Sequence, residues 1–178
     1  MSTTVRPDNL KAALDAKVAA AMSQLVELRE AEQLRVTLHL NPREIISTFL
    51  LYASAVYRIA EPFGREQAGD LQFDAWYGQW LAKLGDADRA LWKQLREERA
   101  RQERGQGAAL IEVEISVSSD PSITAQQPVL GGPADVPKRL IRFASSPNTP
   151  ASELCDDYLR LARRFTDDFV RDYARFLP

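Results

Sequence analysis

The sequence predicts an α+β fold: a single helix-rich domain of 178 residues, in which about five helices cover a small three-stranded antiparallel sheet. Two observations lead to this prediction. In two short segments apolar and polar residues alternate, which is typical of half-buried strands, and a third, shorter segment at 138–144 is expected to be a strand although its facing is ambiguous. In longer segments apolar residues recur every three or four positions, which is typical of helices packed on a core. The strands are expected at about 34–40, 109–117 and 138–144.

The first helix is expected to follow a loose tail at 1–7 and to end near Gln33. Its apolar residues are separated alternately by four and three positions, which predicts a seam packed along another helix. The seam residues are Leu14, Val18, Ala21, Leu25 and Leu28. The pattern favours packing within the same domain, and self-association is the alternative.

The central helix is predicted from a strand that runs directly into a helix start. Asn41 is a suitable N-cap and Pro42 suits the first helical position. The residues that follow are apolar on almost every side, so the segment 42–60 is expected to be a buried helix that packs on the sheet. Pro62 and Gly64 are expected to end it.

Two further helices are expected in the middle of the chain. Asp70 is predicted to cap a helix at 71–84, and Asp86 is predicted to cap the next one. Trp76, Tyr77 and Trp80 share one helix face and are expected in the core. The apolar stripe of the fourth helix stops at Leu95, so its charged end is predicted to project past the body before Gly105.

The second and third strands are expected to form a hairpin whose tip is the long Pro- and Gly-rich segment 118–137. Unstructured segments of this length within compact domains are usually functional or disordered. Thr149 and Pro150 then predict the start of the last helix. Its apolar stripe comprises Leu154, Tyr158, Leu161, Phe165, Phe169, Tyr173 and Phe176.

Composition narrows the possible functions. Apolar residues make up 45% of the chain and charged residues 27%, and the net charge of −2 provides no overall attraction to nucleic acid. No glycine-rich nucleotide motif is present, so no cofactor is expected. Neither a secretory signal nor a membrane span is expected. The sequence therefore predicts a cytoplasmic protein with no membrane contact, and its composition suggests a bacterial source.

The function that the sequence favours is a non-enzymatic protein-interaction module: a subunit, adaptor or inhibitor within a larger assembly. Its partner would be another protein or a second copy of the chain. The candidate partner-binding residues lie in the long loop and at the charged end of the fourth helix. They are Pro128, Gly131, Gly132, Arg96, Arg99 and Arg101.

The first alternative is a nucleic-acid-binding accessory factor. Arg89, Lys93, Arg96 and Arg104 fall within one sector of the predicted fourth helix, which is typical of a phosphate-facing stripe. Glu97 and Glu103 flank this sector and weaken its field.

The second alternative is a metal-dependent nuclease or hydrolase. His39, Glu112 and Glu114 lie on the polar sides of two predicted strands and have suitable side chains for Zn²⁺, Mn²⁺ or Fe²⁺. Alternating glutamates on an exposed strand are, however, more typical of a solubilising surface, so no metal is expected. Cys155 is followed directly by two aspartates, Asp156 and Asp157, which disfavour its thiolate, and an inert, partly buried thiol is expected.

Overall fold

The computed structural model describes residues 9–33, 41–106, 110–115 and 138–173. Helices dominate these residues, as predicted. In chain order the elements are α1 (Leu10–Gln33), α2 (Pro42–Ala68), α3 (Asp70–Ala82), α4 (Asp86–Glu103), β1 (Leu110–Ile115), β2 (Lys138–Phe143) and α5 (Ala151–Tyr173).

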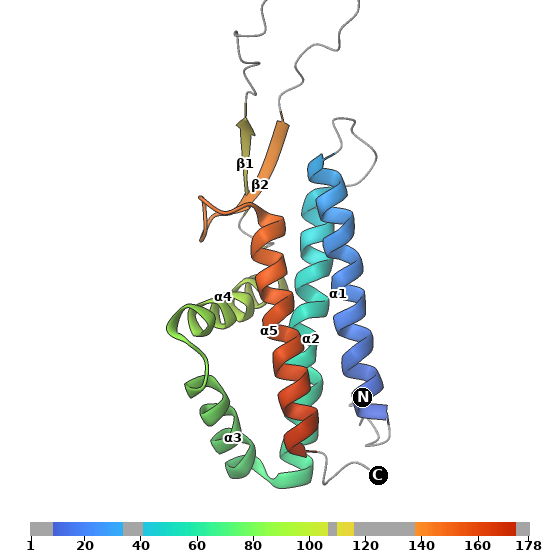
Figure 1. The fold of residues 1–178 in the computed structure, drawn as a ribbon, viewed down its shortest axis with the longest axis vertical. Helices are drawn as coiled ribbons and strands as arrows, with labels where there is room; N and C mark the ends of the chain where they lie inside the picture. Colours follow the sequence, from blue (N-terminus) through green and yellow to red (C-terminus); the bar gives the residue numbers. More distant parts are fainter. Residues whose placement is uncertain (1–8, 34–40, 107–109, 116–137, 174–178) are drawn as a thin grey trace, which may run out of the picture.

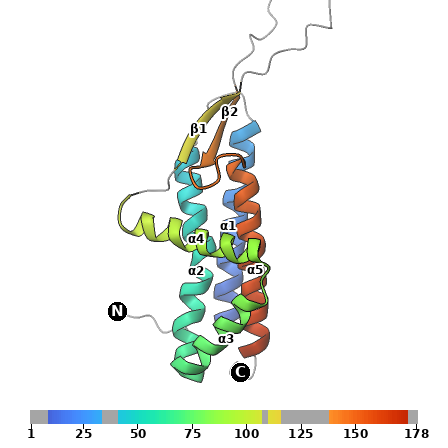
Figure 2. The same cartoon turned by 90° about the vertical axis from the view of Figure 1, so that its left-hand side faces the viewer.

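Three long helices form the body of the molecule. Helices α1, α2 and α5 lie side by side along the long axis, and the strands extend from one end (Figure 1). Helix α3 lies against the side of this bundle, and α4 lies crosswise over α2 and α5 (Figure 2). The structure is therefore a helix bundle with a side arm, which we call the α3–α4 arm.

The sheet is smaller than predicted. In the described residues it has two antiparallel strands rather than three, with Leu110 opposite Phe143 and Ile115 opposite Lys138. The predicted strand 34–40, the tail 1–7 and the segment 118–137 lie outside the described residues. Strand β2 contacts α1 and α5, whereas α2 packs mainly along those two helices. In the described residues the central helix thus packs mainly on helices, and its expected packing on the strand 34–40 stays a prediction.

The predicted seam of α1 lies inside the domain. Leu14, Ala21, Leu25 and Leu28 are buried and Val18 is partly buried against the core. The helix packs along α2 and α5. These residues are therefore used within the chain and are not available to a partner.

Helix α2 continues beyond its predicted end. Asn41 caps its start as expected, but Pro62 and Gly64 lie inside the helix, which ends at Ala68. Gly64 serves packing instead, because a Cβ atom there would collide with the ring of Phe73 on α3. The helix ends before Gly69, whose φ of +88° is a conformation that glycine adopts readily.

The residues predicted to cap α3 and α4 are part of the helices themselves. Asp70 and Asp86 are the first helical residues, and Gly69 and Gly85 precede them. Both predicted caps therefore lie inside the first turn, where a carboxylate is still favoured by the helix dipole.

The charged end of α4 packs on α2 instead of projecting past the body. Glu98 is buried, the side chain of Gln102 donates to the Ser47 carbonyl, and Glu103 pairs with Arg58. The prediction failed because ion pairs and hydrogen bonds hold this polar segment against α2, and the hydrophobic pattern does not register such contacts.

An aromatic cluster joins the arm to the bundle. Phe165 of α5 lies at its centre, with ring centroids 5.1 Å from Trp80, 5.3 Å from Trp92 and 5.7 Å from Trp76. The described residues of the predicted α5 stripe are all buried, and Phe176 lies outside the described residues. Burial of this cluster fixes where α3 and α4 sit.

Candidate interaction surface

The two helices of the arm enclose a groove that opens to solvent, with a volume of about 670 Å³. We call it the α3–α4 groove. Tyr77 and Leu81 of α3 and Trp92 of α4 line its apolar part. Arg89, Lys93 and Arg96 of α4 follow one another along its length and form a basic rim.

The apolar part of the groove is held rigidly. Trp92 is 1% exposed, and its indole nitrogen donates a 2.9 Å hydrogen bond to the Tyr77 hydroxyl. The Trp92 ring also meets Trp80 edge to face at 5.1 Å. The side chains of Tyr77 and Trp92 are therefore already in place for a ligand, which reduces the entropy lost on binding.

Two of the three rim cations are fixed by contacts within the chain. Arg89 donates to the carbonyls of Leu81 and Leu84, at 3.2 and 3.1 Å, at the end of α3. The Leu81 carbonyl also accepts from the Leu84 backbone N–H at 3.2 Å, so the arginine adds to the capping of this helix end. These bonds hold the guanidinium at one end of the groove.

Arg96 is held by aromatic rings. Its guanidinium lies 4.5 Å from the centroid of the Tyr57 ring, and it donates a 3.0 Å hydrogen bond to the Tyr77 hydroxyl. Burial, together with the nearby charge of Glu61, raises the pKa of Tyr57 to about 12, so this phenol is neutral at pH 7. The Arg96 charge is therefore not neutralised by the ring beneath it.

Lys93 is an exposed cation of the rim with no hydrogen bond to a ring or a backbone carbonyl among its described contacts. Its side chain is 77% exposed, and its nearest acidic partner is Glu97 at 3.7 Å. An exposed pair at this distance contributes little free energy. A carboxylate of a binding partner can therefore take the place of Glu97 beside Lys93 with little loss of free energy.

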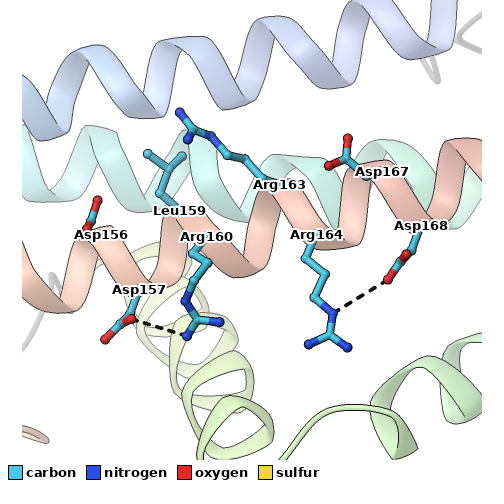
Figure 3. A pocket seen from close by; sticks show the side chains of 8 residues that line it. All are labelled: Asp156, Asp157, Leu159, Arg160, Arg163, Arg164, Asp167 and Asp168. Atoms are coloured by element: carbon cyan, nitrogen blue, oxygen red, sulfur yellow. Dashed lines mark hydrogen bonds and ion pairs between the residues drawn. The ribbon is translucent and has the colours of Figure 1, made fainter.

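The outward side of α5 forms a second candidate surface, a hollow of about 510 Å³ (Figure 3). Arg163 points toward α1, whereas Arg160 and Arg164 point to the opposite side of the helix (Figure 3). Arg160 spans to Asp88 of α4 at 2.8 Å, and Arg163 contacts the sulfur of Met22 on α1 at 2.9 Å. These arginines tie α5 to its neighbours.

The charges in this hollow largely cancel. Its lining contains the three arginines together with Asp156, Asp157, Asp167 and Asp168. A mixed surface of this kind attracts neither anions nor cations strongly. The α3–α4 groove is therefore the better candidate for a binding site.

The structure brings together three of the four residues predicted to bind nucleic acid. Arg89, Lys93 and Arg96 share the groove, whereas Arg104 lies at the end of α4 as its C-cap. The groove also depends on Leu81, which was not among the predicted site residues. In the sequence, Leu81 only continues the apolar face of Tyr77 and Trp80, which indicates core packing.

The other predicted partner-binding residues are scattered. Arg99 pairs with Glu103 at 3.3 Å and its side chain is only 18% exposed, whereas Arg101 is exposed. Pro128, Gly131 and Gly132 lie outside the described residues, so their role stays a prediction.

The predicted metal site stays untested. His39 lies outside the described residues, and the backbones of Glu112 and Glu114 pair with Ile141 and Arg139. In the part of the chain that the structure describes, no group of three or more histidine, cysteine or acidic side chains could hold a metal ion.

The thiol of Cys155 is fully buried rather than partly buried as predicted. Burial raises its pKa well above the ordinary value, and the charge of Glu32 adds to this effect. The expectation of an inert thiol agrees with this position, because the thiolate is the reactive form.

Comparisons of the chain with protein-family models, with curated proteins and with solved structures found no match. Among the described helices, none combines the length and the apolar character that a membrane span requires.

Proposed function

We propose that this protein is a non-enzymatic interaction subunit, which binds an acidic segment of a partner protein in the α3–α4 groove. The observation that carries the proposal is the combination of an apolar floor at Tyr77, Leu81 and Trp92 with the basic rim of α4. Partner sites in proteins commonly pair a desolvated apolar centre with a polar border.

The charges favour an acidic occupant over a basic one. Three cations line the groove against two acids, Asp86 and Glu97. Arg89 and Arg96 are held in place and need little reorganisation to accept a carboxylate. Hydrogen bonds between charged groups are shorter and stronger than neutral ones, so each carboxylate contact would add affinity and orientation.

Nucleic acid is the second candidate occupant, because Arg89, Lys93 and Arg96 lie in one row that a phosphate backbone could follow. Asp86 and Glu97 line the same groove and interrupt the row, which opposes a continuous phosphate backbone more than separate carboxylates of a partner protein. Binding to phosphates would weaken steeply as salt concentration rises, because each contact releases counterions.

The test captures partners of the tagged full-length protein from its own host, with nuclease treatment in one arm. Lys93→Glu reverses an exposed charge of the rim, and Lys83→Glu makes the same change at an exposed lysine outside the groove. We expect a partner that survives nuclease and is retained by Lys83→Glu but lost by Lys93→Glu.

A partner retained equally by both variants would contradict the groove as the binding site. A partner lost after nuclease treatment would favour the nucleic-acid alternative.

The metal-dependent alternative predicts that Mn²⁺ or Zn²⁺ raises the melting temperature, because a ligand that binds only the native state stabilises it.

A further inference from the structure

In the part of the chain that the structure describes, Arg96 differs from the other two cations of the basic rim because no acidic side chain forms an ion pair with it. Arg89 lies 3.4 Å from the carboxylate of Asp86. Lys93 lies 3.7 Å from the carboxylate of Glu97. Two positive charges of the rim are thus matched by acids of the same helix, whereas the third is left for an anion from outside the chain.

The surroundings of Arg96 strengthen its attraction for such an anion. Its guanidinium lies over two rings, 4.5 Å from the centroid of Tyr57 and 5.8 Å from that of Tyr77. Glu61, the acid whose charge acts on Tyr57, pairs with Arg65 at 3.1 Å. The rings keep water from part of the guanidinium, so a carboxylate that contacts it meets a stronger field than at a fully solvated arginine.

The hydroxyl of Tyr77 supplies a second donor at the same place. It accepts hydrogen bonds from Trp92 Nε1 at 2.9 Å and from Arg96 Nη1 at 3.0 Å. A hydroxyl has two acceptor positions and one proton to donate, so both acceptor positions of Tyr77 are filled. Among the described residues its own proton has no acceptor. A carboxylate that contacts Arg96 can accept this proton as well.

We propose that Arg96 and Tyr77 form a carboxylate-binding position, and that the segment bound in the α3–α4 groove carries an aspartate or glutamate beside an apolar residue. This inference rests on the proposed function of the groove. The Tyr77 hydroxyl bonds both to Arg96 of the rim and to Trp92 of the apolar floor. The acidic and apolar groups of the segment must therefore lie close together and on one side of it.

The carboxylate belongs to a side chain within the segment rather than to the end of a chain. The lining of the groove extends along α4 on both sides of Arg96, from Asp86 to Ala100. This stretch of helix is about 21 Å long, which about six residues of extended chain would cover. A chain that ended at Arg96 would leave the groove empty on one side of it.

The experiment selects binders of the full-length protein from a random peptide library displayed on phage, in which each peptide is joined to the coat protein through its carboxyl end. We expect the selected sequences to share an aspartate or glutamate beside an apolar residue. Selection that yields no binders, or binders without a shared acid, would overturn the inference. So would binders found only in a second library whose peptides have free carboxyl ends.

A selected peptide is then synthesised with both ends blocked, and its dissociation constant is measured by isothermal titration calorimetry. Arg96→Gln should weaken binding at least about tenfold, because a hydrogen bond between charged groups is lost. Arg101→Gln is the matched control, since Arg101 is an exposed arginine of α4 outside the lining of the groove, and it should leave binding unchanged. Circular dichroism checks that both variants keep their helices.

Replacing the acidic residue of the peptide with its amide tests the same contact from the other side, with the protein unaltered. It should weaken binding to the wild type at least about tenfold and binding to Arg96→Gln by only about twofold, because groups in direct contact are not additive. Equal losses for the two proteins would overturn the contact.

Failure of this contact and failure of the proposed function are distinguishable. A host partner that Lys93→Glu loses but Arg96→Gln retains would keep the groove as the binding site and overturn the carboxylate-binding position. Peptides that depend on Arg96, without any host partner that depends on Lys93, would support the carboxylate-binding position and contradict the proposed function.

Discussion

Trp80 and Asp168 join the arm to the bundle: the indole nitrogen of Trp80 on α3 donates a 3.0 Å hydrogen bond to the carboxylate of Asp168 on α5. One turn away, Trp76 makes the same bond to Asp172 at 2.9 Å. Two indoles spaced by four residues thus meet two carboxylates spaced by four residues. This match sets the position of α3 along α5, and α3 in turn forms one wall of the groove.

We expect Trp80→Phe to destabilise the protein by at least about 1 to 2 kcal/mol, because the bond to Asp168 is lost and the smaller phenyl ring leaves part of the buried indole volume empty. Asp168 keeps its ion pair with Arg171 at 2.8 Å, which limits the loss. Urea unfolding followed by circular dichroism measures the effect. Trp76→Phe, whose bond is exposed, should cost less. Equal stability of wild type and Trp80→Phe would show that the bond does not hold the arm.

We expect Gly64→Ala to destabilise the protein by about 1 to 3 kcal/mol, because the added methyl group would collide with the ring of Phe73. Gly78→Ala is the matched control in α3, where an added Cβ meets nothing within 4 Å. It should stabilise the protein by about 0.5 to 1 kcal/mol through helix propensity. Chemical denaturation of both variants tests this, and a stabilising Gly64→Ala would refute the close approach.

Asp88 makes part of the stability dependent on pH. A hydrogen bond from Arg160, working against burial, lowers the pKa of this carboxyl below its ordinary value. The unfolded chain, in which an aspartate has a pKa of about 3.9, therefore takes up the proton first. The stabilisation is complete well above this pH and is lost as pH falls through the folded pKa.

We accordingly expect Asp88→Asn to be less stable than wild type by about 0.5 to 1 kcal/mol at pH 7, as for an ion pair near the surface. The difference should shrink as the solution is acidified below about pH 4. Urea unfolding at a series of pH values measures it. A difference that grows on acidification would have the wrong sign for this mechanism.

The thiol of Cys155 should be unreactive in the native protein, because it is fully buried and its pKa is raised. We expect the thiol reagent DTNB to label it more than about a hundredfold more slowly at pH 8 than after unfolding in urea. Rapid labelling of the folded protein would show that the core around α5 opens readily.

The sequence alone predicted most helices to within a few residues, but it misjudged the role of particular residues. Pro62 and Gly64 are helix breakers by propensity, yet α2 passes through both. The buried ring of Phe63 and the contact of Gly64 with Phe73 bind this turn to the core. Packing of this kind outweighs local preference, and no pattern within α2 reveals it.

The groove could be predicted only in part. The periodicity of α4 placed Arg89, Lys93 and Arg96 in one row, and the structure agrees. What lies opposite the row depends on the angle between α3 and α4, because that angle places Tyr77 and Leu81 beside it. Arg96 was predicted as a partner-binding or phosphate-binding group, but it also lies on the Tyr57 ring of α2, which is distant in sequence.

The order of residues by itself determined which segments are helical and which side of each faces the core, because helix formation and burial follow local periodicity. Only the tertiary structure decided where the arm lies, which charges are engaged and which faces are left open. Those outcomes depend on contacts such as Trp80 with Asp168 and Arg160 with Asp88, which join residues more than seventy positions apart. Periodicity within one helix carries no information about such pairs.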